Sequence, residues 1–359
     1  MGELILKWAL KNAIDHKGVA QTGAVVPKVI GEKPEMQSKV KELIPTITKI
    51  VKEVNAMTPE KQELMLKEIA PELLIKKTEE KKTFPELLNV KGKVIMTFPP
   101  EPSKYATIGH ARAAFLNYYY VQKYGGRFIL RFEDTNAEKV KEEYEKSIIE
   151  DFKWLGLKIN SVDYISDHIE KMYKNAEKLI KKDAAYMCNC PVERSREKRK
   201  AGEFCICRAR NIDKNLELWQ KMLNSKTKQG EYILRAKINM KHKNAAMRDP
   251  TIFMVRKGRH YRTGSKYSVW PVYDFATAVM DGIEKITHRL RSKEFEQKAE
   301  VQKWIQTQLG INSPTITEFA RTNLAGVPSS GRVIREGLAS GKFTGWDDPR
   351  LPTLVAMKR

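Results

Sequence analysis

A proline-rich loop between a strand-like run and a helix-like run constrains the fold of this chain most strongly. Residues 98–110 read Phe-Pro-Pro-Glu-Pro-Ser-Lys-Tyr-Ala-Thr-Ile-Gly-His. The apolar residues 93–96 before the loop predict a buried strand, and residues 128–132, beyond a Gly-Gly pair, predict a second strand. The segment between the loop and the second strand has the spacing of one helix face, formed by Ala111, Ala114, Phe115 and Tyr118.

This order of elements predicts a βαβ unit with parallel strands and a right-handed crossover. Ligands of such sheets bind beyond the carboxyl ends of the strands, where the loop lies. A proline-stiffened loop that opens into a helix N-terminus offers free N–H groups and a positive dipole end to phosphates. The sequence therefore predicts an α/β fold with a phosphate-binding site at the loop.

The charge of the chain favours a polyanionic partner. Lys and Arg number 66 and Asp and Glu number 44, which leaves a formal net charge of +22. A lysine-rich solvated surface is the simpler explanation of this excess. The more specific explanation is a polyanionic partner that is bound through its phosphates. Such binding depends strongly on the salt concentration. Charge alone does not say which polyanion is bound.

Length and hydrophobicity indicate an ordinary globular protein. The 359 residues suffice for two or three domains, and 41% of them are hydrophobic. No apolar run reaches about 18 residues, so we expect no membrane span. The first residues, Met-Gly-Glu-Leu-Ile-Leu-Lys, lack a signal-peptide pattern and a myristoylation motif. We therefore expect a cytoplasmic protein.

All four cysteines lie in two tight pairs. Cys188 and Cys190 form one pair, Cys205 and Cys207 form the other, and 14 residues separate the pairs. In a cytoplasmic chain this pattern favours a tetrahedral Zn²⁺ site over disulfides. Four thiolates leave no open coordination position, so the zinc would be structural. The alternative is two incidental pairs of thiols.

Further motifs follow the loop in a fixed order. Residues 130–136 read Leu-Arg-Phe-Glu-Asp-Thr-Asn, and residues 272–275 read Val-Tyr-Asp-Phe. Residues 286–288 read Ile-Thr-His, and residues 345–351 read Gly-Trp-Asp-Asp-Pro-Arg-Leu. Together with Ile-Gly-His-Ala at 108–111, these motifs resemble the glutamyl/glutaminyl branch of the class I aminoacyl-tRNA synthetases, especially its archaeal and eukaryotic type. One short motif recurs by chance, whereas five in order do not.

The resemblance implies a Rossmann-type parallel-sheet catalytic domain with an inserted acceptor-binding domain and an N-terminal helical extension. It implies a glutamate–tRNA ligase that uses ATP and Mg²⁺ to form glutamyl-adenylate and transfers glutamate to the 3′ end of tRNA(Glu). Many archaeal relatives also load tRNA(Gln). The implied parts are the helical extension at 1–88, the first half of the nucleotide domain at 89–165, the insertion at 166–268, the second half at 269–325, and the late loop with the start of the stem-contact region at 326–359.

Within the second half, the parallel sheet is expected to resume at residues 269–275, followed by a helix through Ala278. In the extension, helical spacing is predicted for Leu43, Ile47, Ile50, Val51 and Val54. A helix start is predicted at Thr58-Pro59, and a polar linker or a frayed helix end at residues 76–82.

Matching motifs assign three residues to the amino acid. Glu133 matches the acid that binds the substrate ammonium, and Tyr273 matches a substrate-contacting tyrosine, although a tyrosine beside aromatic residues is often core. Arg291 stands where glutaminyl enzymes hold an uncharged residue. Its planar guanidinium pairs with a side-chain carboxylate and would leave a neutral amide unsatisfied, which favours glutamate. Ser103, where glutaminyl enzymes usually have Asn, agrees with this choice.

The resemblance also assigns the residues that handle ATP. No side-chain base is needed, because the attacking group is already a carboxylate, so the site must align the reactants and stabilise phosphate charge. A simpler interpretation of His110 is a helix-capping or surface histidine. The assigned residues are Pro100, Thr107, Gly109 and His110 in the first loop and Ser329, Ser330 and Arg332 in the late loop.

Departures from the family pattern keep other interpretations open. Thr97 replaces a usual arginine, Thr107 replaces the first histidine of the loop motif, and the late loop at 327–333 has no lysine. These changes predict a slow enzyme or relocated cations, with Lys293 and Arg332 as candidates. The chain stops after residues 345–351, where relatives continue into anticodon-binding barrels, so we expect a fragment, a separate second chain, or a protein that works on acceptor stems alone. The alternatives are a glutaminyl-tRNA synthetase, a shortened paralogue that modifies a tRNA base, and a non-catalytic tRNA- or synthetase-binding module.

Overall fold

The computed structural model describes residues 1–74, 84–224, 227–320, 324, 326–328 and 330–359. The chain divides into two compact units, Met1–Pro85 and Glu86–Arg359, which we describe separately. The predicted linker at 76–82 lies outside the described residues.

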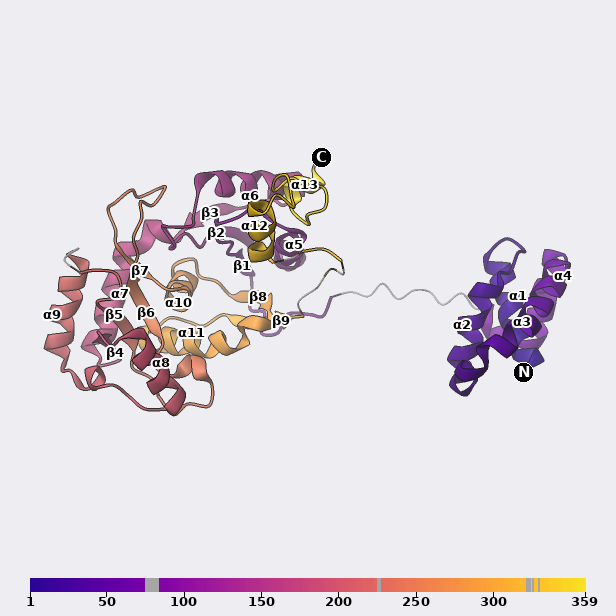
Figure 1. Cartoon of the computed structure of the whole chain (residues 1–359), viewed down its shortest axis with the longest axis horizontal. Helices are drawn as coiled ribbons and strands as arrows, with labels where there is room; N and C mark the ends of the chain where they lie inside the picture. The colour runs from indigo at the N-terminus through magenta and orange to yellow at the C-terminus, as the bar shows by residue number, and fades with distance from the viewer. Residues whose placement is uncertain (75–83, 225–226, 321–323, 325, 329) are drawn as a thin grey trace. The chain divides into compact units, whose positions relative to one another are not determined.

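Helices alone make up the regular structure of the described part of the first unit (Figure 1). The α-helices are α1 (Gly2–Asp15), α2 (Thr22–Glu32), α3 (Val40–Asn55) and α4 (Pro59–Ile69), and two short 3₁₀ helices span Pro34–Lys39 and Pro71–Leu73. The predicted stripe of α3 is buried at Leu43, Ile47, Val51 and Val54, and Ile50 packs against this core at its edge. The Thr58 hydroxyl accepts the Lys61 N–H, which confirms the predicted start of α4. Residues 84–88 are not helical, so the expectation of helix throughout 1–88 is wrong there.

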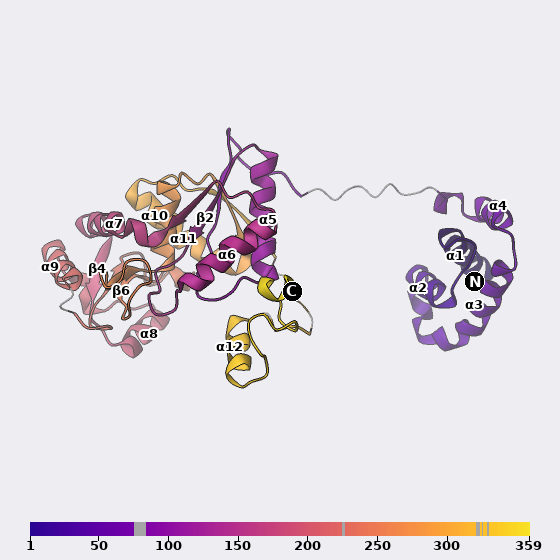
Figure 2. The same cartoon turned by 90° about the horizontal axis from the view of Figure 1, so that it is seen from above.

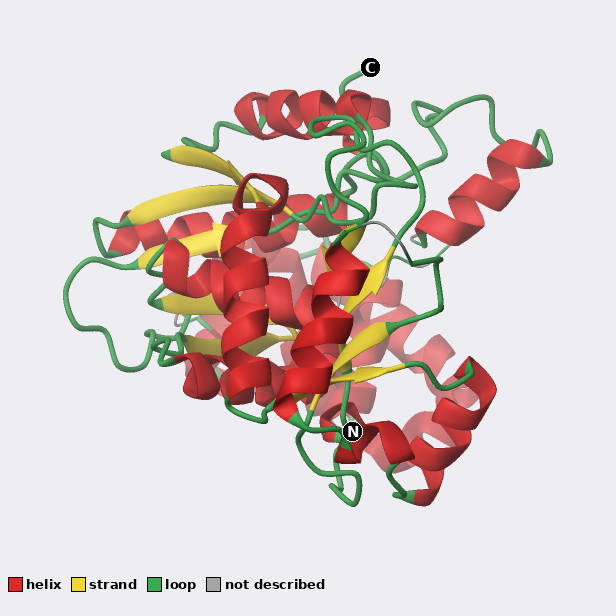
Figure 3. Ribbon diagram, turned by 90° about the vertical axis from the view of Figure 1, so that its left-hand side faces the viewer, coloured by secondary structure: helices red, strands yellow, loops and turns green. Residues whose placement is uncertain are grey.

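A parallel sheet organises the second unit. Its strands β1 (Ile95–Phe98), β2 (Arg127–Phe132) and β3 (Ser161–Tyr164) pair in the order β1-β2-β3. A second parallel pair consists of β8 (His288–Ser292) and β9 (Thr315–Phe319). The two pieces meet where the Thr287 N–H donates to the Ile95 carbonyl at 3.0 Å. The predicted parallel βαβ unit is therefore confirmed, and Figure 3 distinguishes its strands, in yellow, from the helices.

Side chains alternate across this sheet, as strand geometry requires. On β2, Phe128, Leu130 and Phe132 pack into a core with α5 (Ile108–Lys123) and α6 (Glu142–Trp154). Arg131, on the opposite face, contacts α10 (Tyr273–Ile283), which packs against α11 (Glu296–Leu309). Figure 2 shows these two pairs of helices on opposite sides of β2. The predicted face of α5 is buried at Ala111 and Ala114, but Phe115 is 41% exposed, so its assignment to the core was wrong.

An antiparallel sheet lies between the two parallel pieces in the sequence. It contains β4 (Ala185–Cys188), β5 (Ile233–Ala236), β6 (Thr251–Val255) and β7 (Val269–Pro271), with the helices α7 (Ile169–Lys181), α8 (Val192–Ala201) and α9 (Ile212–Leu223). The expectation that the parallel sheet resumes at residue 269 is wrong, because β7 pairs antiparallel with β6. Apolar periodicity identifies a buried strand but not its partner. The predicted helix through Ala278 is confirmed as α10.

The last described segment packs against the first loop. It contains α12 (Gly331–Ala339) and α13 (Leu354–Met357). The Ile108 N–H donates to the Pro352 carbonyl at 3.0 Å, and the Leu354 N–H donates to the Ala106 carbonyl at 2.8 Å. The Trp346 ring lies 5.7 Å from the ring of Tyr105. The Gly-Trp-Asp-Asp-Pro-Arg-Leu string thus supports the loop that leads into α5. Among the described residues, no helix is long and apolar enough to span a membrane.

Candidate active site

Thr107 and His110 cap the N-terminus of α5 reciprocally. The Thr107 N–H donates to His110 Nδ1 at 3.0 Å, and the Thr107 hydroxyl lies 2.8 Å from the same nitrogen. Nδ1 therefore holds a lone pair, which places the proton of the neutral ring on Nε2. Burial and the nearby Lys104 ammonium lower the pKa of His110 to about 4, so the ring is neutral at pH 7. The capping role fits Nδ1 and leaves Nε2–H available as a donor.

Lys104 is a cation of this site that the sequence interpretation missed. Besides its effect on His110, its side chain lies against the first residue of α12. A Cβ added to Gly331 would stand 2.9 Å from Lys104 Cδ and 3.2 Å from its Nζ. The first loop and the N-terminus of α12 therefore meet at this lysine. Its position in the loop was visible in the sequence, but its long-range contact was not.

Two of the late-loop residues, Ser330 and Arg332, can be placed in the structure. Ser330 is the N-cap residue of α12, and the Arg332 side chain is 81% exposed, with a long 3.7 Å approach to Glu336. Ser329 lies outside the described residues. Thus Ser330 stands beside the contact between Lys104 and Gly331, whereas Arg332 extends into solvent.

Glu133 is held by its backbone and lies almost fully buried. Its N–H donates to the Pro100 carbonyl at 2.9 Å, which ties the end of β2 to the first loop. Its Oε1 accepts the Thr277 hydroxyl at 3.2 Å and lies 3.8 Å from Arg131 Nε. Burial raises the pKa of Glu133 to about 7, against the opposing pull of Arg131 and Arg289. This carboxyl can therefore change charge near neutral pH.

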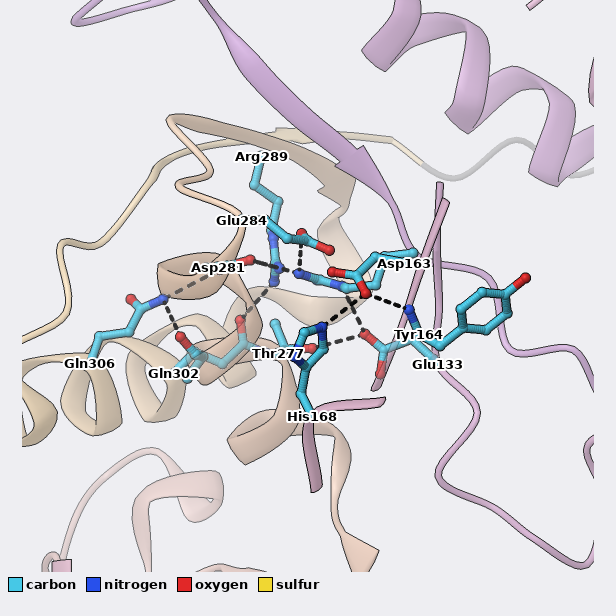
Figure 4. A network of polar contacts seen from close by, with 12 residues as sticks. Glu133, Asp163, Tyr164, His168, Thr277, Asp281, Glu284, Arg289, Gln302 and Gln306 are labelled. Carbon is cyan, nitrogen blue, oxygen red and sulfur yellow. Dashed lines mark hydrogen bonds and ion pairs between the residues drawn. The ribbon is translucent and has the colours of Figure 1, made fainter. Parts of the chain in front are cut away.

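Two buried arginines, which the sequence interpretation passed over, surround Glu133. Arg131 Nη1 donates to Glu284 Oε2 at 2.9 Å and to Asp281 Oδ1 at 3.2 Å. Arg289 pairs with the same Asp281 oxygen and donates to Gln302 at 3.3 Å. Figure 4 shows Asp281, Glu284 and Arg289 directed toward one another. Alternation on β2 and β8 was the available signal, because it places these charges on one face.

Arg291 carries N–H groups that its neighbours do not satisfy. The residue is 7% exposed, and its Nη1 donates to Gln302 at 3.1 Å. Within the described part of the chain, its Nε and Nη2 have no hydrogen-bond partner, and Glu318 Oε1 stays 3.8 Å from Nε. Burial, with the charge of Arg289, lowers the pKa of Arg291. A buried guanidinium with open donors is suited to an anionic ligand.

Tyr273 lies within the electrostatic reach of both Glu133 and Arg291. It begins α10, and burial is the main cause of its raised pKa. The charges of Arg289, Glu133, Arg291 and Arg131 all act on its hydroxyl, so these side chains share one neighbourhood. Its ring packs 5.6 Å from that of Phe295. The structure therefore brings together the three side chains expected to bind the amino acid.

Two hydrogen bonds link this neighbourhood to the first loop and to α5. One is the bond from Glu133 N–H to the Pro100 carbonyl. In the other, Asn117 of α5 donates to the Leu290 carbonyl, beside Arg291, at 3.5 Å. The site expected for the amino acid and the site expected for ATP thus share the carboxyl edge of the parallel sheet, as this class of fold predicts.

The four cysteines gather into one cluster. All four Sγ atoms lie within 4.8 Å of one another, and the 188–205 and 190–207 pairs are each 3.8 Å apart. Thiolates about 2.3 Å from a tetrahedral Zn²⁺ stand about 3.8 Å from one another, whereas a disulfide needs about 2.05 Å. The donor set therefore fits zinc.

Comparison with known proteins places the chain in a family. The family described as "tRNA synthetases class I (E and Q), catalytic domain" matches residues 93–359. The chain belongs to this family. It is 45% identical over 364 aligned residues to the glutamate–tRNA ligase of Thermococcus onnurineus, covering 99% of this chain and 64% of that protein. It is 42% identical over 359 residues to the ligase of Methanocaldococcus jannaschii, covering 100% of this chain and 64% of the relative.

The chain thus spans about two thirds, at 64%, of the length of these relatives. A solved glutamate-tRNA synthetase from Elizabethkingia anophelis matches 70% of this chain and 54% of its own, with a TM-score of 0.50 and 20% identity. This likeness supports the class I synthetase fold. The family assignment, with the parallel sheet, confirms the predicted fold class.

Two departures from the synthetase pattern, at Thr107 and Thr97, lie in different surroundings in this family member. Thr107 serves as the N-cap of α5. Thr97 is 1% exposed, and no described residue hydrogen-bonds its hydroxyl. Since Met96 and Phe98 pack beneath α5, Thr97 faces the same side of the sheet as Arg131 and Arg289. That face therefore carries arginines on β2 and β8 although β1 has none.

Proposed function

We propose that this chain carries the catalytic region of a glutamate–tRNA ligase. The observation that supports the proposal most strongly is Arg291, which is 7% exposed and has two unsatisfied donors in the neighbourhood of Glu133 and Tyr273. Leaving buried donors unpaired costs free energy unless a ligand supplies acceptors. A side-chain carboxylate supplies two acceptors in the planar geometry that a guanidinium matches.

The amino-acid side of the proposed site has complementary charges at its two ends. Ionised Glu133 binds the substrate ammonium, and Tyr273 contacts the body of the amino acid. Arg291 Nε and Nη2 donate to the side-chain carboxylate. Glutamine presents an NH₂ group to the same donors, so it leaves at least one unsatisfied, and the site selects glutamate.

The ATP side of the proposed site uses the two helix N-termini. Pro100, Thr107, Gly109 and His110 line the approach of the nucleotide, and His110 donates through Nε2. Ser329, Ser330 and Arg332 contact the outer phosphates, and Lys104 supplies a cation between the two helices. Mg²⁺ bound to ATP would neutralise phosphate charge in addition.

The first step of the proposed reaction depends on the alignment of glutamate with ATP. The α-carboxylate oxygen of glutamate bonds to the α-phosphorus of ATP, and the bond to the bridging oxygen breaks, which releases pyrophosphate. In the second step, a ribose hydroxyl at the tRNA 3′ end attacks the acyl carbon and AMP leaves. The protein orients these groups and stabilises the charge that develops on oxygen.

The inserted region supports tRNA as the partner. Residues 166–268 contain 26 Lys and Arg and 11 Asp and Glu. A cavity of about 610 Å³ lies in this region, lined among others by Lys228, Arg256, Lys257 and Tyr267. Cations and an aromatic ring in one cavity suit a phosphate and a base. We propose that 166–268 binds the acceptor end of tRNA(Glu) between two halves of the nucleotide domain, 89–165 and 269–325, with 1–88 as the extension and 326–359 as the late-loop region.

A structural Zn²⁺ is part of the proposal. It would be held by Cys188, Cys190, Cys205 and Cys207 and would stabilise the lobe that carries the basic helix α8. We expect about one zinc per chain by elemental analysis of freshly purified protein. A ratio far below one would reject the site. Cys205→Ser should lower both the zinc content and the unfolding temperature.

Glutamate-dependent exchange of pyrophosphate into ATP tests the activity, with tRNA(Glu) present throughout. We expect exchange with glutamate to exceed exchange with glutamine. No exchange above background with either amino acid would favour the non-catalytic binding module. Faster exchange with glutamine would identify a glutaminyl enzyme instead.

A further inference from the structure

His260 lies outside the proposed site but is bonded to the backbone beside Glu133. It belongs to the segment between β6 and β7, so it comes from the antiparallel region of the chain. The residue is 1% exposed, and its Nε2 lies 2.8 Å from the Asp134 carbonyl oxygen. We propose that His260 is a positioning residue, which holds Glu133 in the orientation that binds the substrate ammonium. This inference rests on the function proposed above.

The hydrogen bonds of the ring fix its tautomer. Nδ1 accepts the backbone N–H groups of Arg262 and Thr263, each at 3.2 Å. The proton is therefore on Nε2, which donates it to the Asp134 carbonyl. The ring is also packed between aromatic neighbours, 4.9 Å from Tyr261 and 5.0 Å from Trp270. His260 thus presents a rigid donor to Asp134.

Glu133 is fixed from both sides by this arrangement. On one side its N–H donates to the Pro100 carbonyl, and on the other the carbonyl of the next residue accepts from His260. The Asp134 side chain adds a third restraint, because its Oδ1 accepts the Ser166 N–H at 3.0 Å. The Glu133 N–H and the carbonyl of the following residue are both held, so the backbone is restrained before and after Glu133 and its Cα–Cβ bond has a defined direction.

The segment around His260 is itself well anchored. A pair of backbone hydrogen bonds joins His260 and Gly264, at 2.9 and 2.8 Å. Arg262 pairs with both oxygens of Asp167, at 3.0 and 2.9 Å. These bonds allow His260 to transmit the position of the antiparallel region to the end of β2. Loss of the donor should therefore change amino-acid binding and leave the ATP side intact.

Substitution at His260 with separate measurement of the two substrates tests the proposal. His260→Phe keeps a ring for the aromatic packing but removes the donor. We expect its dissociation constant for glutamate, measured by calorimetry on the full chain, to rise about tenfold, since a small misplacement weakens a geometry-dependent contact. The dissociation constant of this variant for ATP should stay within about twofold of that of the unsubstituted chain. His260→Gln, whose amide can donate to the Asp134 carbonyl, should restore most of the glutamate affinity.

His288 offers a matched control. It is 3% exposed, its Nδ1 lies 2.9 Å from the Thr287 hydroxyl, and its Nε2 lies 2.9 Å from the Leu88 carbonyl. His288→Phe removes a comparable bond at the start of β8, and we expect glutamate affinity within about twofold of the unsubstituted chain. Where His260→Phe does not fold, His260→Asn replaces it, because its amide is too short to reach Asp134.

The outcomes separate the two proposals. Unchanged glutamate affinity in folded His260→Phe, or equal losses for glutamate and ATP, would overturn the positioning role. Failure of His260→Gln to recover glutamate affinity would also count against it. An unsubstituted chain that binds glutamate without pyrophosphate exchange would overturn the catalytic function but leave this test intact. No glutamate binding at all would overturn both.

Discussion

The amino-acid side and the ATP side of the proposed site are built differently. On the amino-acid side, Arg131, Arg289 and Arg291 are 0%, 3% and 7% exposed and share hydrogen bonds with buried acids and Gln302. On the ATP side, the Arg332 side chain is 81% exposed, with its Nε 3.7 Å from Glu336 Oε1. The amino-acid side is assembled before a ligand arrives, whereas the ATP side includes the exposed Arg332 at a helix N-terminus.

This difference teaches how selectivity and phosphate binding divide between two parts of one sheet edge. A buried guanidinium distinguishes a carboxylate from an amide because unpaired donors are costly without water. Triphosphate recognition needs less discrimination, so exposed cations and backbone N–H groups suffice. The comparison predicts large effects from substitutions in the buried part and small ones in the exposed part.

Stability should show the largest effect. Arg131→Met removes the partner of two buried carboxylates, Glu284 and Asp281. We expect a loss of about 3–5 kcal/mol in unfolding free energy, because an uncompensated buried charge remains. Urea denaturation followed by tryptophan fluorescence measures it. Arg332→Met is the exposed control, with an expected change under about 0.5 kcal/mol. Equal losses of unfolding free energy in the two variants would contradict the difference between the buried and the exposed side.

Glutamate use should respond next most strongly. Arg291→Cys removes the proposed partner of the side-chain carboxylate and should lower kcat/KM for glutamate by about 30- to 1000-fold, equivalent to roughly 2–4 kcal/mol. Exchange assays with glutamate and with glutamine, at fixed ATP, measure the change. An unaltered preference for glutamate would remove Arg291 from the pocket.

The pH dependence of glutamate binding follows from Glu133. The pKa of this carboxyl is raised to about 7 by burial, so the charged form that attracts an ammonium is lost as pH falls below that value. We expect the KM for glutamate to increase up to about tenfold per pH unit below 7 and to level off above it. Glu133→Gln should abolish the dependence and bind weakly throughout. A flat profile in the unsubstituted chain would contradict the assigned role.

The smallest effect is expected on the ATP side. Lys104→Met removes one cation next to His110 and Gly331. We expect the KM for ATP to rise about fivefold, as for one hydrogen bond, while the KM for glutamate stays constant. Steady-state exchange with each substrate varied in turn provides the measurement. A larger effect on glutamate than on ATP would place Lys104 on the other side of the site.

Local patterns predicted much of this molecule. The strand–loop–helix–strand unit, the α3 stripe and the cysteine cluster follow from spacing, which local geometry determines. Spacing did not predict the strand with which β7 pairs, because an apolar run does not specify its neighbouring strand. The sequence did not identify Arg131 and Arg289 as buried. A charged residue in a strand is expected to face solvent unless the acids that pair with it are known. The contact of Lys104 with Gly331 and that of His260 with Asp134 join residues far apart in the sequence, which no local pattern encodes.

A crystal structure of the chain with bound glutamate would test the central claim most directly. The account predicts the side-chain carboxylate within hydrogen-bond distance of Arg291 Nε and Nη2, and the ammonium against Glu133. A glutamate bound elsewhere, with those two guanidinium nitrogens still unpaired, would contradict it.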